Sequence, residues 1–168
     1  MLNSKGFTLI ELIIVIVILS LLALVALPRF LSFGSDARIS SLNGIAAQLR
    51  ATTQLVQAKA RVQGLRASTV NPGGLQDNFL VDFGYASAEV MFSNLCPESI
   101  AENGDRLRLL DFVNTSFTDD ISTRVDNRYT LIGYDVPSTG VPLNQGCYIL
   151  YDSFATPNCT IELVTDDC

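Results

Sequence analysis

The chain has 168 residues, with four cysteines, no histidine and no tryptophan, and it carries a formal net charge of −6. Without histidine, neither a Ser-His-Asp nor a Cys-His catalytic arrangement can be built. The acidic balance argues against general nucleic-acid binding, which depends on Lys and Arg side chains that neutralise phosphates. The sequence also contains no phosphate-binding loop, dinucleotide fingerprint or calcium loop. We therefore expect no enzyme, no cofactor and no metal site.

The first predicted element is a membrane-spanning helix. Residues 7–27 carry one charge, Glu11, and two hydroxyls, and are otherwise apolar. A run of about 20 apolar residues is long enough for a helix to cross the hydrocarbon core of a bilayer. Only residues 1–6 precede it, with a positive charge at Lys5. This charge predicts that the chain starts in the cytoplasm and continues outside.

Glu11 is the unusual residue of this segment. An ionisable side chain in a membrane span costs a few kcal/mol, so it indicates a function and requires a partner. No basic residue lies within the apolar run. A cut after Gly6 would create a positive α-amino group at Phe7, and this amine, in the same chain or in a neighbouring copy, is the predicted partner.

Two other kinds of N-terminal segment fit less well. A cleaved secretory signal has an apolar region of 7–15 residues and an A-x-A-like site. Here the run is longer, Glu11 interrupts it, and Ala23 and Ala26 have the wrong spacing. A plain signal anchor fits the length but leaves Glu11 and the Gly6–Phe7 junction unexplained.

The helical pattern continues beyond the apolar run, over residues 29–66. Pro28 removes one backbone hydrogen bond, which predicts a kink or a loosened segment within residues 24–34, and Gly64 weakens the helix end. Polar side chains are expected largely on the faces of this helix away from its buried seam: Arg38, Ser41, Gln48, Arg50, Gln54 and Gln57. Steps of three and four separate the residues of a predicted buried seam: Ile39, Leu42, Ala46, Leu49, Thr53, Val56 and Ala60.

Charge divides the chain into a basic stem and an acidic head. Residues 29–66 hold six cations against one acid, a net +5, whereas residues 67–168 hold fifteen acids against four arginines, a net −11. The asymmetry fits simple solubility of the head. It also fits an assembly in which stems pack inside, heads face outward, and surfaces of opposite sign attract.

The head is predicted to end in a small antiparallel sheet. Residues 71–74 form a turn, residues 85–95 a short helix, and residues 107–113 a short helix or strand. The three predicted strands are residues 128–136, 147–154 and 159–165, the last two forming a hairpin. A three-stranded sheet needs a covering layer, and the apolar seam of the stem supplies it. The predicted fold class is α+β, a long N-terminal helix packed on a small antiparallel sheet.

Four cysteines beyond a membrane span, without C-x-x-C, favour disulfides over a metal site. Three connectivities are possible. The predicted hairpin sets Cys147 across from about Asp166, so Cys147 and Cys159 lie too far apart to bond. Cys147–Cys168 closes the open end of the hairpin and is the favoured pair, which leaves Cys96–Cys159.

The N-terminal string K-G-F-T-L-I-E-L, followed by an apolar run and a proline, resembles the class III signal of type IV pilins, in particular type IVa. This resemblance implies that prepilin peptidase cuts between Gly6 and Phe7 and N-methylates Phe7. It also implies that Glu11 offsets the terminal amine of the next subunit during assembly.

Further segments are similar to the mannose-sensitive haemagglutinin pilins. Cys96 and Cys159 depart from the two-cysteine pattern expected of that group. The similar segments are P-R-F-L (28–31), D-A-R-I-S-S-L-N-G (36–44), L-V-Q-A-K-A-R-V-Q-G (55–64), V-D-F-G-Y-A-S-A (81–88) and G-C-Y-I-L-Y (146–151).

The resemblance implies a structural subunit, expected to be the major one, of a type IV pilus used for adhesion. The expected partners are other copies of the chain, prepilin peptidase and the pilus assembly machinery of the inner membrane. The precursor is expected in the inner membrane and the product in an extracellular pilus of a Gram-negative bacterium. The expected regions are a leader (1–6), a transmembrane or filament-core helix (7–28), the amphipathic half of that helix (29–66) and a globular head (67–168).

Two alternative functions share parts of this pattern. A pseudopilin of a type II secretion system has the same signal and stem, so its head must distinguish it. A single-pass anchored periplasmic binding domain needs the anchor alone and gives Glu11 no role.

Overall fold

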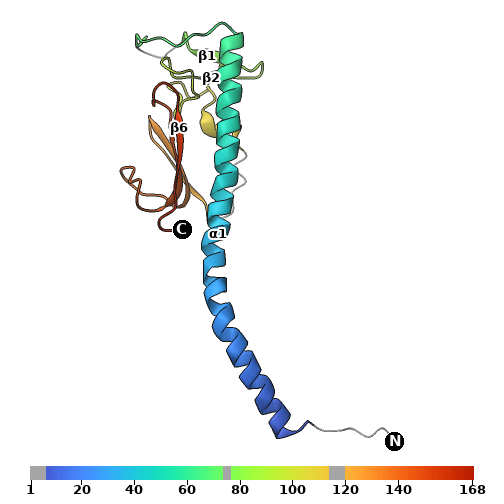
Figure 1. The fold of residues 1–168 in the computed structure, drawn as a ribbon. Helices are drawn as coiled ribbons and strands as arrows, with labels where there is room; N and C mark the ends of the chain where they lie inside the picture. Colours follow the sequence, from blue (N-terminus) through green and yellow to red (C-terminus); the bar gives the residue numbers. More distant parts are fainter. Residues whose placement is uncertain (1–6, 74–76, 114–119) are drawn as a thin grey trace, which may run out of the picture. The chain divides into compact units, whose positions relative to one another are not determined.

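The computed structural model describes residues 7–73, 77–113 and 120–168, with the backbone alone for residues 25 and 27–32 (Figure 1). The chain divides into two compact units, Met1–Ala37 and Arg38–Cys168. One long helix and antiparallel strands make up the fold, which confirms the predicted α+β class. The elements are α1 (Leu9–Val62), β1 (Leu80–Asp82), β2 (Ser87–Glu89), the 3₁₀ helix η1 (Leu109–Phe112), β3 (Ser122–Val125), β4 (Tyr129–Asp135), β5 (Cys147–Asp152) and β6 (Thr160–Val164).

Helix α1 ends four residues earlier than the predicted Arg66. Gly64 has φ +87°, a left-handed conformation that glycine adopts without strain. The Leu65 N–H donates to the Ala60 carbonyl and the Gly64 N–H to the Arg61 carbonyl, both at 3.0 Å. These two bonds form a Schellman motif, which satisfies carbonyls that a helix end otherwise leaves open.

The backbone of α1 is assigned as helix without interruption through Pro28. The kink expected at Pro28 therefore stays a prediction. Across the described residues, no helix combines the length and the apolar character that crossing a membrane requires.

The main sheet has four strands in the order β3-β4-β5-β6, all antiparallel. The prediction of three strands was wrong because it missed β3. That strand reads Ser-Thr-Arg-Val, without apolar alternation, and it lies at an edge where it pairs with β4 alone. An edge strand with little buried surface leaves little hydrophobic pattern in the sequence.

The C-terminal hairpin forms, with a register one residue away from the predicted one. Tyr148 pairs with Val164 and Asp152 with Thr160, whereas the predicted register placed Phe154 opposite Cys159. Strand β5 is buried along its whole length because both faces of the sheet are covered. On the outer face, Tyr148 and Leu150 pack with Val141 of the loop that follows β4.

The inner face of the sheet packs on the second half of α1 (Figure 1). The predicted seam is buried from Leu42 to Ala60, while Ile39 is half-buried. Gln57, expected on another face, is also buried, because its amide donates to the Asn94 carbonyl at 3.0 Å. The cluster beneath the sheet contains Leu42, Ile45, Ala46, Leu49, Leu109, Val113, Ile132, Cys147, Ile149 and Tyr151.

The short helix predicted over residues 85–95 is wrong. Strand β2 lies there instead and pairs with β1 as a two-stranded antiparallel sheet, with Val81 opposite Ala88. These strands close a second apolar cluster around Val56 and Ala60 near the end of α1. The helix or strand predicted at 107–113 is the 3₁₀ helix η1, and the turn predicted at 71–74 is described as far as Gly73.

Candidate functional site

The first turn of α1 is closed by a reciprocal pair of side chains. The Thr8 N–H donates to Glu11 Oε2 at 2.9 Å, and the Glu11 N–H donates to Thr8 Oγ1 at 3.4 Å. The Thr8 hydroxyl also donates to the same Glu11 oxygen at 2.8 Å. This is a capping box, in which residues three apart satisfy backbone donors that the helix leaves unpaired. Glu11 thus has a partner within its own chain that we did not predict.

The spacing T-x-x-E before an apolar run is typical of a capping box, and this pattern in the sequence predicts the contact between Thr8 and Glu11. The capping contact of Glu11 with Thr8 leaves room for the predicted contact with a terminal amine. Both hydrogen bonds from Thr8 to the carboxylate use Oε2, and Glu11 is exposed, so an amine can approach Oε1 from outside. A carboxylate in the first turn is in any case favourable beside the positive end of the helix dipole.

Phe7 precedes this capped turn. It is outside the helix, and 84% of it is exposed. Its predicted cleavage partner, Gly6, lies outside the described residues. A terminal amine made at Phe7 would stand one residue from the helix cap, next to the Thr8 N–H that Glu11 accepts. Of the predicted cleavage, methylation and assembly residues, Phe7 and Glu11 thus both lie at the start of α1, four positions apart.

The apolar residues that follow Glu11 face outward on all sides of the helix. From Phe7 to Leu24, the large apolar side chains are between 46% and 84% exposed. A helix that is apolar all round requires an apolar environment, either lipid or other protein helices. Residues 12–24 therefore expose an apolar surface in the single chain.

A narrower apolar stripe, here called the outer stripe, lies on α1 within the second unit. Each of its residues stands two positions after a buried one, which at about 100° per residue turns it to the opposite side of the helix. All six residues are exposed, Leu55 by 59% and Val62 by 86%. They are Gly44, Ala47, Ala51, Leu55, Ala58 and Val62.

Residues 1–27 match the family model of the prokaryotic N-terminal methylation motif. This motif is typical of type IV pilins and pseudopilins and supports a prepilin peptidase substrate of one of these two kinds. It includes Gly6, Phe7, Thr8 and Glu11 and ends before Pro28. No curated protein and no solved structure matches the chain.

The cysteines form two disulfides, Cys147–Cys168 and Cys96–Cys159, with Cα–Cα distances of 4.8 and 6.0 Å. These are the pairs expected from the hairpin. The first joins the start of β5 to the last residue of the described chain. The second joins the loop after β2 to the turn before β6, across 63 residues.

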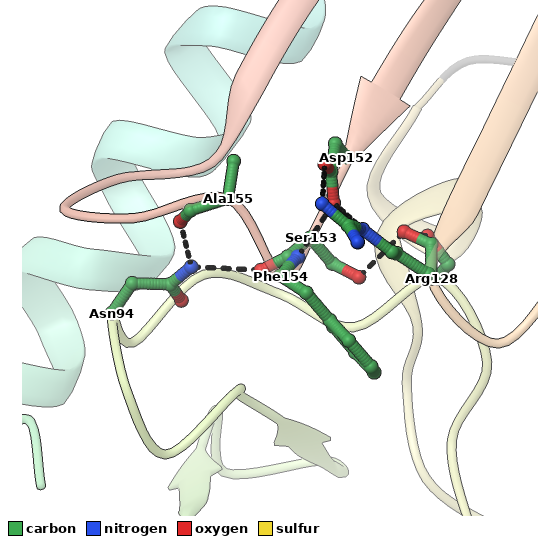
Figure 2. Close-up of polar contacts among 7 residues, drawn as sticks. Asn94, Arg128, Asp152, Ser153, Phe154 and Ala155 are labelled. Atoms are coloured by element: carbon green, nitrogen blue, oxygen red, sulfur yellow. Dashed lines mark hydrogen bonds and ion pairs between the residues drawn. The ribbon is translucent and has the colours of Figure 1, made fainter. Parts of the chain in front are cut away.

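Asn94 organises that second junction, as Figure 2 shows. Its buried amide donates to the carbonyls of Ser153 and Ala155 at 2.8 and 2.9 Å, and its Oδ1 accepts the Cys96 N–H at 2.8 Å. Beside it, Arg128 and Asp152 form a two-point ion pair, with contacts of 2.8 and 2.6 Å. The turn between β5 and β6 is therefore fixed from several directions.

The head also contains a buried acid. Glu89 is fully buried, its Oε2 accepts the Glu102 N–H at 2.8 Å, and its Oε1 lies 3.3 Å from an Arg106 nitrogen. Desolvation raises the pKa of the Glu89 carboxyl, and the Glu102 N–H and the Arg106 guanidinium oppose this rise. Arg106 also forms an ion pair with Asp77. Glu89, Arg106 and Asp77 therefore connect β2 to two loops, and their role is to stabilise the fold.

Proposed function

We propose that this protein is a structural, non-enzymatic subunit of a type IV pilus, and its major subunit. The observation that carries the proposal is the N-terminal methylation motif, with Glu11 placed one turn from the Phe7 terminus. The apolar surface that follows requires partners of the same kind, which a bundle of identical helices supplies.

In this proposal the precursor is inserted in the inner membrane of a Gram-negative bacterium through residues 7–28. Prepilin peptidase removes residues 1–6 and methylates Phe7, and the assembly machinery then extracts the chain into a filament. There each Glu11 carboxylate offsets the terminal amine of a neighbouring copy, and the heads form the outer surface. In this proposal, adhesion is a property of the whole fibre.

The pseudopilin remains the second candidate, because the methylation motif fits it equally well. The two disulfides in the head favour an exposed pilin, since such bridges stabilise small domains outside the cell. Deletion of the gene separates the two: loss of surface pili supports the pilin, whereas intact pili point to a pseudopilin.

The state of the N-terminus tests the proposal directly. We expect mass spectrometry of sheared surface fibres to find a first peptide that begins at N-methylated Phe7. A mature protein that still begins at Met1, or that is cut downstream of Ala26, would contradict the proposal. A chain that is processed at Phe7 but stays in the membrane fraction would contradict the location in a surface fibre and leave the predicted processing standing.

We also propose that the outer stripe packs against the stems of neighbouring copies, because it is the exposed apolar side of the helix, and this gives a second prediction. In Ala51→Arg, we expect fibre yield to fall at least about tenfold, because a charge would be buried between packed stems. The stability of the single chain should change by less than about 0.5 kcal/mol, because Ala51 is exposed. The matched control is Asn43→Arg, which adds the same charge at an exposed polar position of α1. Equal fibre yields for both variants would remove the stripe from the interface.

A further inference from the structure

A cavity of about 610 Å³ lies where α1 ends, against the junction that Asn94 and the Cys96–Cys159 disulfide hold. Three segments line it: the end of α1 and the residues that follow, the loop after β2, and the turn before β6. Its volume is within the range of about 300–1,000 Å³ that is usual for small-molecule sites. The lining residues are Arg61, Gly64, Leu65, Arg66, Ala67, Asn94, Leu95, Pro157 and Asn158.

The charge of this cavity contrasts with that of the head around it. Residues 67–168 carry a net −11, yet the described residues that line the cavity include two arginines and no acid. Arg61 and Arg66 are both exposed, and neither joins an ion pair among the described residues. Two unpaired guanidinium groups at one cavity favour an anionic ligand, because their planar forks match a carboxylate or a phosphate.

The helix end does not cancel this positive charge. A helix C-terminus presents open carbonyls, which repel anions. Here the carbonyls of Lys59, Ala60 and Arg61 already accept the N–H groups of Gln63, Leu65 and Gly64. The same Schellman turn directs the chain so that Leu65 and Arg66 line the cavity.

The remaining wall suits a compact ring with hydroxyl groups. Leu65 and Pro157 offer apolar surface, and the exposed amide of Asn158 offers both a donor and an acceptor. The wall is held in place, because the Asn94 amide donates to the carbonyls of Ser153 and Ala155 in the turn (Figure 2) and its Oδ1 accepts the Cys96 N–H of the loop. Leu95 keeps a left-handed φ of 62°, a conformation that non-glycine residues adopt rarely and often at functional sites.

We propose that this cavity binds a carboxylate carried on a sugar-sized ring, as in a uronic acid. Arg61 and Arg66 bind the carboxylate, and Asn158 binds ring hydroxyls. The site is complete within one chain, so it does not depend on assembly into a fibre.

The test uses the full-length chain in detergent micelles and saturation-transfer NMR titrations. The probes are glucuronate, glucose as its neutral match, and inorganic phosphate as an anion without the ring. We expect glucuronate to bind and glucose to bind at least about tenfold more weakly. No binding of glucuronate overturns the proposal, and phosphate that binds as tightly as glucuronate overturns the role of the ring.

Three variants locate the site. Arg61→Gln and Arg66→Gln should each weaken glucuronate binding about tenfold, the value of one charge-assisted contact. Arg50→Gln is the control, because it removes an exposed cation of the same helix that does not line this cavity. An equal loss in Arg50→Gln would show general charge attraction and overturn the assignment. Unchanged thermal unfolding in all three variants verifies that the head is folded.

Discussion

Replacing Glu11 by glutamine is expected to abolish fibre assembly while the start of helix α1 stays intact. Glutamine can still accept the Thr8 N–H, since Gln serves in capping boxes as well as Glu does. It cannot offset a terminal amine, so the neighbouring copy would bury an unpaired positive charge. Leaving one partner of a buried ion pair alone costs about 3–5 kcal/mol. Because one such loss recurs at every subunit, no fibre should be visible by electron microscopy.

The matched control is Thr8→Val, which removes the hydroxyl but keeps the Glu11 charge. Loss of a capping side chain costs about 1 kcal/mol, so this variant should still form fibres at a reduced yield. The order of yields therefore separates the two roles of Glu11. Normal fibres from Glu11→Gln with poor fibres from Thr8→Val would mean that Glu11 acts only as a cap.

The membrane fraction completes this experiment. Both variants should still be processed at Phe7 and retained in the inner membrane, because neither shortens the apolar run. A Glu11→Gln chain that is missing from the membrane would show that the residue acts on insertion or processing. That result would contradict the assembly role.

The parts of the fold that could be predicted are those in which a local pattern determines burial. The seam from Leu42 to Ala60 repeats at steps of three and four, and the structure buries these residues against the sheet. Gln57 breaks the pattern because its partner, the Asn94 carbonyl, comes from 37 residues away. The periodicity of apolar residues indicates which side of a helix is buried, but it contains no information on a hydrogen-bond acceptor that is distant in the sequence.

The short strands of the head were missed for a related reason. Strands β1 and β2 have three residues each, too few to establish an alternating pattern, and Val90 pairs with Pro97 through an isolated bridge. In β3, the residues Ser122–Val125 have no fully buried side chain. What holds these segments is backbone pairing, of β1 with β2 and of β3 with β4, which any sequence compatible with extended structure can make.

At the N-terminus, the pattern of residue types identified Phe7 and Glu11, and the family model covers the same residues. Thr8 was not predicted, because a charged side chain in an apolar run suggests a partner of opposite charge rather than a neutral one. A neutral hydroxyl and a backbone N–H satisfy one carboxylate oxygen here. For an acid in an apolar segment, local hydrogen bonds therefore deserve the same weight as ion pairs.

The two disulfides are expected to differ in their effect on stability. In the chain-entropy account, a bridge stabilises by restricting the unfolded chain, and the effect grows with the length of the closed loop. Cys96–Cys159 spans 63 residues and Cys147–Cys168 spans 21. The same account gives about 4 kcal/mol for the first and about 3 kcal/mol for the second.

Hydrogen bonds beside each bridge also join the segments that the bridge connects. Without Cys147–Cys168, the C-terminal residues keep backbone contacts, since the Gly146 N–H donates to Asp167 Oδ2 at 2.6 Å and the Asp167 N–H to the Gly146 carbonyl at 3.1 Å. Removing Cys96–Cys159 instead disturbs Sγ of Cys96, which accepts hydrogen bonds from Gln57 at 3.3 Å and from the Cys159 N–H at 3.0 Å. Asn94 would still join the same loop and turn through the carbonyls of Ser153 and Ala155, so the expected difference rests on loop length.

We therefore expect Cys96→Ser/Cys159→Ser to lower the free energy of unfolding by about 4 kcal/mol or more, and Cys147→Ser/Cys168→Ser by about 3 kcal/mol or less. The measurement is urea unfolding of the full chain in micelles. Near-ultraviolet circular dichroism of the tyrosines reports on the head, because Tyr148 and Tyr151 are fully buried there. A larger loss from the Cys147 and Cys168 pair would contradict this account. It would mean that closing the C-terminal edge matters more to the head than joining the turn before β6 to the loop after β2.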